Sequence, residues 1–188
     1  MDQIDAGFRN QRLRVDAREV RIGEEVFALD VIDRVACWSA ARRTTGTYTD
    51  TTFWLKVAAG RRSATFYSDS GARDHLLESG RAWWTETRAL LQRAVVPRLL
   101  AGAIGTIDGG GTVLIGGVGC TAADRRGLRT RYPFARPVPW HEIVDTVTER
   151  GVTQVVQRRG GSTRRTLRIT MDQWNALLLP GLVERYRT

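Results

Sequence analysis

The stretch from residue 80 to residue 107 constrains the fold of this chain more than any other. Its apolar residues recur at the spacing of one face of a helix, with arginines on the opposite face. This pattern predicts one long helix. We expect a kink at Pro97, because proline lacks the N–H group that continues the backbone ladder of a helix.

Strand-like patterns lie on both sides of this helix. Two short segments near the start alternate apolar with charged residues, as half-buried strands do, and their apolar members are Leu13, Val15, Val20 and Ile22. Similar patterns begin again at Thr112. Hydrophobic residues make up 42% and charged residues 26% of the 188 residues, which is the composition of an ordinary folded globular protein.

We therefore predict an α+β, mainly β, chain of two small strand-rich units, each ending in a helix and joined through the helix 80–107. The first unit is expected over residues 12–107 and the second over residues 108–188. Residues 1–11 are polar and are expected to be flexible. Units of this size are near the lower limit for an independent hydrophobic core.

Turn residues divide the strands within each unit. A glycine with two arginines at 60–62 predicts a hairpin between apolar runs, and residues 159–162 predict another. Residues 41–52 are rich in Thr, Gly and Arg and are expected to form a loop. Residues 170–173 fit a capping box, which predicts that the final helix begins there.

Two short matches within the sequence suggest an internal repeat. Residues 30–35 parallel residues 142–147 at an offset of 112, and residues 95–100 parallel residues 178–183 at an offset of 83. The offsets differ, so the first unit must contain the longer connections. The repeat supports two units built in the same order, strands first and helix last.

The charge of the chain is positive and uneven. The formal net charge is +9, and Lys56 is the single lysine, so arginine supplies almost all of the basicity. Residues 1–94 contain 15 basic and 13 acidic side chains, whereas residues 95–188 contain 14 and 7. A surface of this sign favours nucleic acid, anionic lipid headgroups or acidic partner proteins.

The second half resembles bacterial pleckstrin-homology (PH)-like domains. The resemblance depends on the following segments: Gly111-Thr112-Val113 leading a strand, Thr121 to Leu128 as a turn, Pro139-Trp140-His141-Glu142-Ile143 leading into a strand, and Asn175-Ala176-Leu177-Leu178 in the final helix. It implies small barrels, each closed by a C-terminal helix, in a tandem of two PH-like units. It also implies a binding or scaffolding module rather than an enzyme, because some relatives bind lipid headgroups and others bind proteins or self-assemble.

The arginines of the second half are the main candidates for an anion or partner site. Guanidinium groups make bidentate, permanently charged contacts to phosphate and carboxylate groups. Two clusters supply the candidates, Arg125, Arg126, Arg129 and Arg131 in one region and Arg158, Arg159, Arg164 and Arg165 around the second hairpin. By analogy with PH domains that hold phosphates at the barrel mouth, the first cluster is preferred. The alternative is a solvated surface with local ion pairs.

Enzyme chemistry finds little support in the sequence. The segment from Gly117 to Ala122 fits a G-x-G-x-x-A pattern, but Gly127 and three prolines in residues 124–139 exclude the helix that dinucleotide binding requires. His75, His141, Cys37 and Cys120 lack the spacing of metal ligands, so we expect no metal, no cofactor and two reduced structural cysteines. The sequence contains no recognisable nucleophile motif.

The tryptophans are expected in the cores of the two units, with one exception. Trp83 and Trp84 are adjacent helix residues whose side chains diverge by about 100°, so one of them is expected to face away from its own unit, as an interface. We predict a cytoplasmic, non-enzymatic module that docks to a partner protein or, peripherally, to an anionic membrane through the second-unit arginines. Nonspecific nucleic-acid binding by the same surface is the alternative, and a phosphate-handling enzyme is third.

Overall fold

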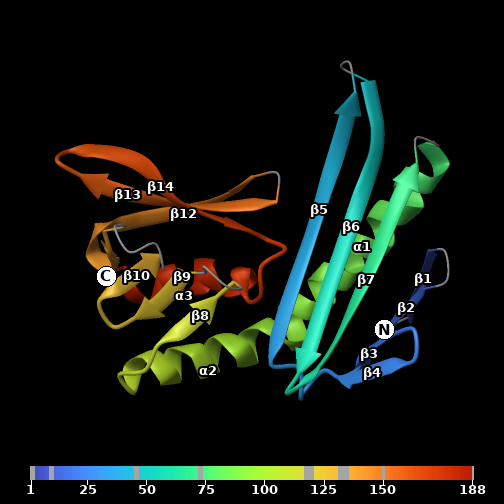
Figure 1. Ribbon diagram of the computed structural model, residues 1–188, viewed down its shortest axis with the longest axis horizontal. Coiled ribbons are helices and arrows are strands. Elements are labelled where there is room, and N and C mark those ends of the chain that lie inside the picture. Colours follow the sequence, from blue (N-terminus) through green and yellow to red (C-terminus); the bar gives the residue numbers. More distant parts are fainter. Residues whose placement is uncertain are drawn as a thin grey trace. The chain divides into compact units, whose positions relative to one another are not determined.

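The computed structural model describes residues 3–8, 11–44, 47–71, 74–116, 121–130, 136–149 and 151–187. The chain divides into two compact units, Met1–Pro97 and Arg98–Thr188. The described residues form four small antiparallel sheets with three α-helices (Figure 1), so the α+β, mainly β, class predicted from the sequence is confirmed. Each unit is described separately below.

The first unit contains a four-stranded sheet, then a three-stranded sheet, then a helix. The first sheet has strands in chain order: β1 (Ile4–Phe8), β2 (Gln11–Val15), β3 (Glu19–Ile22) and β4 (Glu25–Ala28). The second sheet has strands β5 (Arg34–Thr44), β6 (Thr47–Ala59) and β7 (Arg62–Gly71), also in chain order. Helix α1 (Asp74–Ala94) follows.

The alternation of apolar and charged residues places one face of the first sheet in the core. Leu13 pairs with Ile22 and Val15 pairs with Val20, and all four side chains are buried. The prediction that residues 1–11 are flexible is wrong for β1, because Ile4 lies opposite Val15 and is itself buried.

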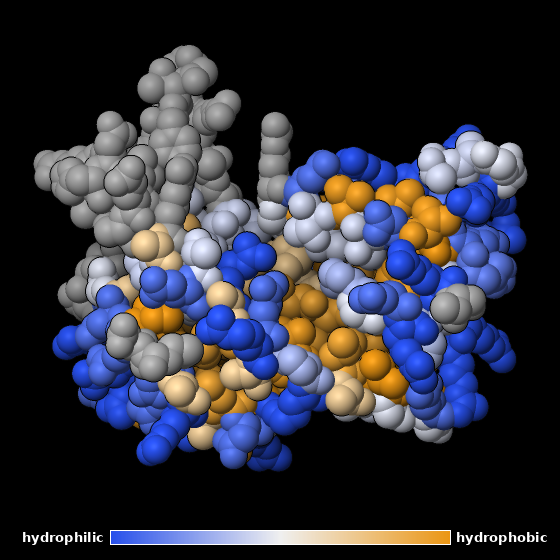
Figure 2. All heavy atoms as spheres, turned by 180° about the vertical axis from the view of Figure 1, so that it is seen from behind, coloured by the Kyte–Doolittle hydropathy of each residue, from blue (hydrophilic) through white to orange (hydrophobic). Residues whose placement is uncertain are grey.

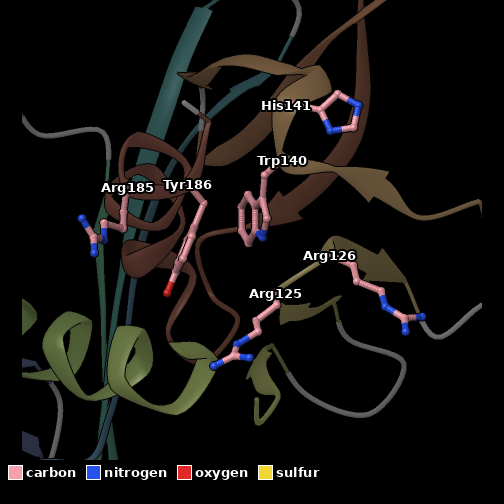
Figure 3. Close-up of a pocket in the computed structure, with 6 residues that line it drawn as sticks. All are labelled: Arg125, Arg126, Trp140, His141, Arg185 and Tyr186. Carbon is pink, nitrogen blue, oxygen red and sulfur yellow. The ribbon is translucent and has the colours of Figure 1, made fainter. Parts of the chain in front are cut away.

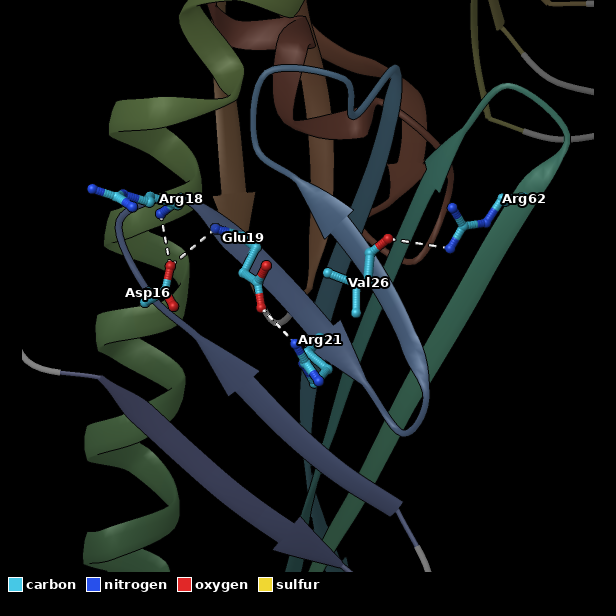
Figure 4. A network of polar contacts seen from close by, with 6 residues as sticks. All are labelled: Asp16, Arg18, Glu19, Arg21, Val26 and Arg62. Carbon is cyan, nitrogen blue, oxygen red and sulfur yellow. Dashed lines mark hydrogen bonds and ion pairs between the residues drawn. The ribbon is translucent and has the colours of Figure 1, made fainter.

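Asp16 fixes the turn between β2 and β3 (Figure 4). Its Oδ1 accepts hydrogen bonds from the backbone N–H groups of Arg18, at 2.7 Å, and Glu19, at 3.0 Å. These bonds stabilise the ionised carboxylate and lower the pKa of Asp16 below its usual value. An aspartate that bonds the backbone two and three residues ahead is a local turn signal, so the sequence itself sets this hairpin.

The predicted loop over residues 41–52 is wrong. Strands β5 and β6 continue through most of this segment, with pairs from Ala41 opposite Thr51 to Thr44 opposite Thr47. Threonine is β-branched and fits an extended, paired backbone, so its enrichment favours strands here rather than a loop. The hairpin predicted around residues 60–62 is confirmed, because Ala59 pairs directly with Arg62.

The single predicted helix over 80–107 is two helices. α1 ends at Ala94, and α2 (Val96–Asp108) begins after Val95. The backbone N–H of Val95 still bonds to the carbonyl of Leu91, at 2.9 Å, but Pro97 has no N–H to continue that ladder. The predicted interruption at Pro97 therefore exists, as a complete break.

The second unit repeats the order of the first after α2. A four-stranded sheet contains β8 (Val113–Ile115), β9 (Thr121–Asp124), β10 (Gly127–Thr130) and β11 (Val138–Pro139). The 3₁₀ turn η1 (Trp140–Glu142) leads to a three-stranded sheet of β12 (Ile143–Glu149), β13 (Val152–Arg159) and β14 (Ser162–Thr170). The 3₁₀ turn η2 (Ala176–Leu178) and helix α3 (Leu179–Tyr186) follow.

Helix α2 belongs to the second unit, so the division falls at Pro97 rather than after residue 107, where the sequence pattern placed it. The Tyr186 hydroxyl of α3 lies 3.3 Å from the carbonyl oxygen of Ile104. Gly181 also approaches α2 closely, since a Cβ there would lie 2.5 Å from Cδ2 of Leu100. These contacts join α2 to α3.

The final helix begins later than the capping box predicts. η2 starts at Ala176 after Asn175, which has a left-handed φ of 59°, and α3 starts at Leu179. The Gln173 N–H bonds to the Thr170 carbonyl in a turn instead of opening a helix. The capping-box prediction is therefore wrong, whereas the prediction of a helix at the end is confirmed.

Of the two internal sequence matches, one relates corresponding elements of the two units and the other does not. Residues 30–35 and 142–147 both lead into the first strand of a three-stranded sheet, β5 and β12. Residues 95–100 lie at the start of α2, whereas residues 178–183 lie in the terminal helix of the second unit. The first match therefore relates corresponding parts of the two units, and the second does not.

One of the two cysteines lies within the described residues. Cys37 is buried and free, and burial raises the pKa of its thiol to about 11, while Cys120 lies outside the described residues.

Among the residues described, no single helix is long and apolar enough to cross a membrane, and only the bent pair Ala82–Ala94 and Val96–Asp108 meets these criteria together.

Candidate functional site

The second unit contains a hollow of about 460 Å³ that we call the basic pocket (Figure 3). Its lining consists of Arg125, Arg126, Trp140, His141, Arg185 and Tyr186. Trp140 and Tyr186 lie side by side at its centre, with Arg126 and Arg185 on opposite sides of this aromatic pair. Arg125 and Arg126 come from the β9–β10 turn, Trp140 and His141 from η1, and Arg185 and Tyr186 from the end of α3.

The aromatic pair forms a fixed centre for the pocket. The rings of Trp140 and Tyr186 stack with centroids 5.1 Å apart and an interplanar angle of 27°. Trp140 is only 5% exposed, and its Nε1–H donates a hydrogen bond to the carbonyl of Asp124, at 2.8 Å. Because the indole is packed and bonded at its polar end, it holds the walls of the pocket in place.

Tyr186 is held at its hydroxyl group. The hydroxyl lies 2.8 Å from Oδ1 of Asp108, to which it donates a hydrogen bond. Burial of the phenol, together with this bond to the carboxylate, raises the pKa of Tyr186 to about 12. The residue therefore contributes a neutral aromatic ring to the pocket, not a negative charge.

A tight turn presents the two arginines of the first cluster. Oδ1 of Asp124 accepts a hydrogen bond from the backbone N–H of Arg126, at 2.8 Å. Oδ2 of the same carboxylate forms an ion pair with Arg129 of β10, at 3.0 Å. Gly127 follows with a φ of +144°, a backbone region that other residues rarely adopt. This glycine brings β10 close to Val138 of β11 and so sets the distance between the turn and Trp140.

The arginines of the pocket differ in whether they bond to other groups of the protein. Nε of Arg125 donates a hydrogen bond to the carbonyl of Ile107, at 3.2 Å, at the negative end of the α2 dipole. Among the residues that the structure describes, the side chains of Arg126 and Arg185 form no ion pair. These two exposed guanidinium groups are therefore the ones available to a ligand.

The structure brings together only part of the predicted anion site. Arg125 and Arg126 line the pocket, Arg129 is paired with Asp124, and Arg131 lies outside the described residues. The second cluster lies on β13 and β14 and contributes nothing to the pocket lining: Arg158, Arg159, Arg164 and Arg165. Two of the four members of the first cluster therefore line the pocket, and their role in binding an anion or a partner stays a prediction.

Two of the six pocket residues, Arg185 and Tyr186, were not candidates in the sequence. They come from the last helix, far along the chain from the arginine cluster, and no local motif links them to Trp140. His141 is exposed and lines the pocket. Only the apolar stripe that packs α3 on the unit could have indicated that Tyr186 approaches this region.

Trp83 and Trp84 both pack inside the first unit, so the expectation that one faces away from it is wrong. Their ring centroids lie 5.4 Å and 5.5 Å from that of Phe53, and Trp84 is 5% exposed. The two indoles also contact each other, with ring centroids 5.7 Å apart, so the three rings form one cluster. Their role as an interface stays a prediction.

Two other tryptophans lie outside the core, contrary to expectation. Trp38, Trp54 and Tyr67 occupy directly opposite positions on β5, β6 and β7 and are all partly exposed. Their neighbouring ring centroids are 5.3 Å and 5.5 Å apart. Strand alternation explains this arrangement, because Phe53 points into the core and Trp54 must then point outward.

The described residues add no support for a metal site or a dinucleotide-binding site. Within the described ranges, no group of three or more His, Cys, Asp or Glu side chains could hold a metal ion. The G-x-G-x-x-A pattern lies partly outside those ranges, and Thr121 begins strand β9 rather than a helix. His75 lies in α1 at a position where side chains are not described.

Comparisons with known proteins give no further identification. No protein-family model matches the chain, and no curated protein or solved structure matches it. The geometry of the two units therefore carries the functional argument.

Proposed function

We propose that this protein is a non-enzymatic, PH-like binding module whose second unit docks an acidic segment of a partner protein in the basic pocket. One feature supports the PH-like assignment. Both units have a four-stranded antiparallel sheet, then a three-stranded one, then a helix. Strands followed by a helix is the order that the resemblance implies.

The observation that carries the proposal is the spacing of positive charge around the Trp140–Tyr186 pair. Arg126 and Arg185 lie on opposite sides of that pair, with Arg125 and His141 beside it (Figure 3). Guanidinium groups on both sides of two stacked rings favour a ligand with several anionic groups over a single small anion. An extended segment with several carboxylates is such a ligand, and its stem can lie over the partly exposed ring of Tyr186.

The same geometry favours a protein segment over a membrane. Proteins that settle at a bilayer interface present free Trp and Tyr side chains to it. Here the indole N–H of Trp140 and the hydroxyl of Tyr186 already bond to Asp124 and Asp108 within the unit.

The test is the affinity of the whole chain for a fluorescent glutamate-rich peptide. We expect the double variant Arg126→Ala/Arg185→Ala to bind the peptide at least about tenfold more weakly, since each charge-assisted hydrogen bond contributes about 1 kcal/mol or more. Neither side chain forms an ion pair among the described residues, so the fold should survive.

The matched control is Arg14→Ala/Arg18→Ala, which removes the same charge from exposed positions of the first unit. An equal loss of affinity in both double variants would mean that peptide binding depends only on net charge. Retention of full affinity in the pocket variant would contradict the proposal. Binding of the wild-type chain to anionic vesicles but not to the peptide, abolished by the pocket variant, would favour a membrane surface instead.

A further inference from the structure

The tip of the β13–β14 hairpin is exposed on both faces. We call residues 158–165 the arginine hairpin; every residue from 158 to 166 is exposed. The strands remain paired to the end, from Gln157 opposite Arg164 to Arg159 opposite Ser162. The hairpin thus extends past the core as a two-stranded ribbon, and its outer end carries hydrophilic residues, at the upper right in Figure 2.

The register of the ribbon distributes its arginines over both faces. Arg159 and Arg164 share a face with Gln157, because Gln157 lies opposite Arg164 and side chains alternate along each strand. Arg158 and Arg165 occupy the other face, where Arg165 lies opposite Val156. Arg168, opposite Gln154, extends that second row toward the body of the unit.

Among the described residues, one ion pair neutralises a charge of the arginine hairpin. Residues 151–171 include five arginines and no Asp or Glu. Arg165 pairs with Glu149, at 3.0 Å. Within the described part of the chain, the side chains of Arg158, Arg159 and Arg164 form no ion pair.

The corresponding hairpin of the first unit shows the contrast. There Arg62 pairs with Glu25, at 2.6 Å, donates to the carbonyl of Val26 (Figure 4), and lies over the Phe27 ring. The turn itself is held by Asp33, whose Oδ2 accepts a hydrogen bond from the Gly60 N–H, at 2.6 Å. Arg62 therefore ties the first hairpin to β4 of the other sheet in its unit, whereas Arg158, Arg159 and Arg164 of the second hairpin are exposed.

We propose that the arginine hairpin binds duplex DNA by contacting its phosphate backbone from within the major groove. This groove is about 12 Å wide and admits a two-stranded ribbon with phosphates on both sides. Arginines on both faces match two phosphate walls, whereas a flat membrane meets only one face. The same groove in duplex RNA is too narrow and deep for side chains to enter.

The composition of the ribbon also argues against binding to single-stranded nucleic acid or to a lipid membrane. Residues 151–171 contain no Trp, Tyr or Phe. Single-stranded nucleic acid is bound mainly by stacking of bases on aromatic side chains, which this hairpin cannot provide. It likewise lacks the aromatic residues that anchor proteins at a lipid interface. Backbone contacts to a duplex need neither and carry no sequence preference.

This inference goes beyond the proposed function and uses different residues. The basic pocket takes its arginines from the β9–β10 turn and α3, and the ribbon takes its own from β13 and β14. Either binding activity can therefore fail without the other.

The test measures the affinity of the whole chain for random-sequence duplex DNA over a range of NaCl concentrations. For wild type, we expect log K to fall linearly with log [NaCl]. In Arg158→Ala/Arg159→Ala/Arg164→Ala, the slope should decrease by roughly 2 to 3, because each lost phosphate contact accounts for about 0.9. Lysine at the same three positions should preserve most of the slope.

The control Arg14→Ala/Arg18→Ala/Arg61→Ala removes the same number of charges from exposed positions of the first unit. The pocket variant Arg126→Ala/Arg185→Ala should retain DNA binding, which separates this inference from the proposed function. Equal slopes in the hairpin and control variants would overturn the assignment, as would wild-type chain that fails to bind DNA at low salt. Hairpin-dependent binding to anionic vesicles as tight as that to DNA would also overturn it.

Discussion

Replacement of Gly127 by alanine is expected to lower the free energy of unfolding of the second unit by about 3 to 5 kcal/mol. A Cβ at this position would lie 2.1 Å from the carbonyl oxygen of Val138 and 2.8 Å from Cα of Pro139. Both are backbone atoms, so no side-chain rotation relieves the contact. The φ of +144° adds strain for any residue with a Cβ.

The measurement is denaturant unfolding, with amide hydrogen exchange to locate the loss. Exchange should accelerate in β9, β10 and β11, because a change of this size is a large fraction of the stability of a small unit. Gly102→Ala is the matched control: nothing lies within 4 Å of a Cβ at that exposed helix position. It should raise stability slightly, by about 0.5 to 1 kcal/mol. Equal behaviour of the two variants would contradict the close approach of β10 to β11.

The second large effect is expected in the first unit, where Phe53→Ala should cost about 3 to 5 kcal/mol. Phe53 is 2% exposed and lies against both Trp83 and Trp84 of α1. Its removal leaves a cavity between β6 and the helix, and it also removes two aromatic contacts worth about 0.5 to 1.5 kcal/mol each. The change should be visible in the free energy of unfolding and in tryptophan fluorescence.

Phe53→Leu keeps most of the buried volume and should cost clearly less than the alanine variant. Trp54→Ala, one residue along β6, removes a larger but partly exposed ring from the outer face and should also cost less than Phe53→Ala. If Trp54→Ala were the more damaging of the two, the core would lie on the other face of the sheet.

Local chemistry explains which parts of the fold could be predicted. The alternation around Leu13 and Val20, the glycine turns and the break at Pro97 depend on near neighbours, and they appear as expected. The 41–52 segment failed because turn-forming glycine and strand-forming threonine occur together, and pairing between long strands decides the outcome. The capping box failed because two turns precede the final helix.

The site was harder to predict than the fold for a related reason. Composition indicated Arg125 and Arg126, since a cluster of arginines is visible in the sequence. The other pocket residues Arg185 and Tyr186 lie there because α3 packs near Trp140, which is a long-range contact with no sequence signature. The second arginine cluster, predicted around a hairpin, lies on β13 and β14 and contributes no residue to the pocket lining.

The central claim is that the second unit binds an acidic segment over the Trp140–Tyr186 pair. Its most direct test is an NMR titration of the whole chain with the glutamate-rich peptide, following the indole N–H signals. The account predicts that the Trp140 signal shifts saturably while those of Trp38 and Trp54 in the first unit stay in place. A Trp140 signal that does not move while the peptide binds would contradict it.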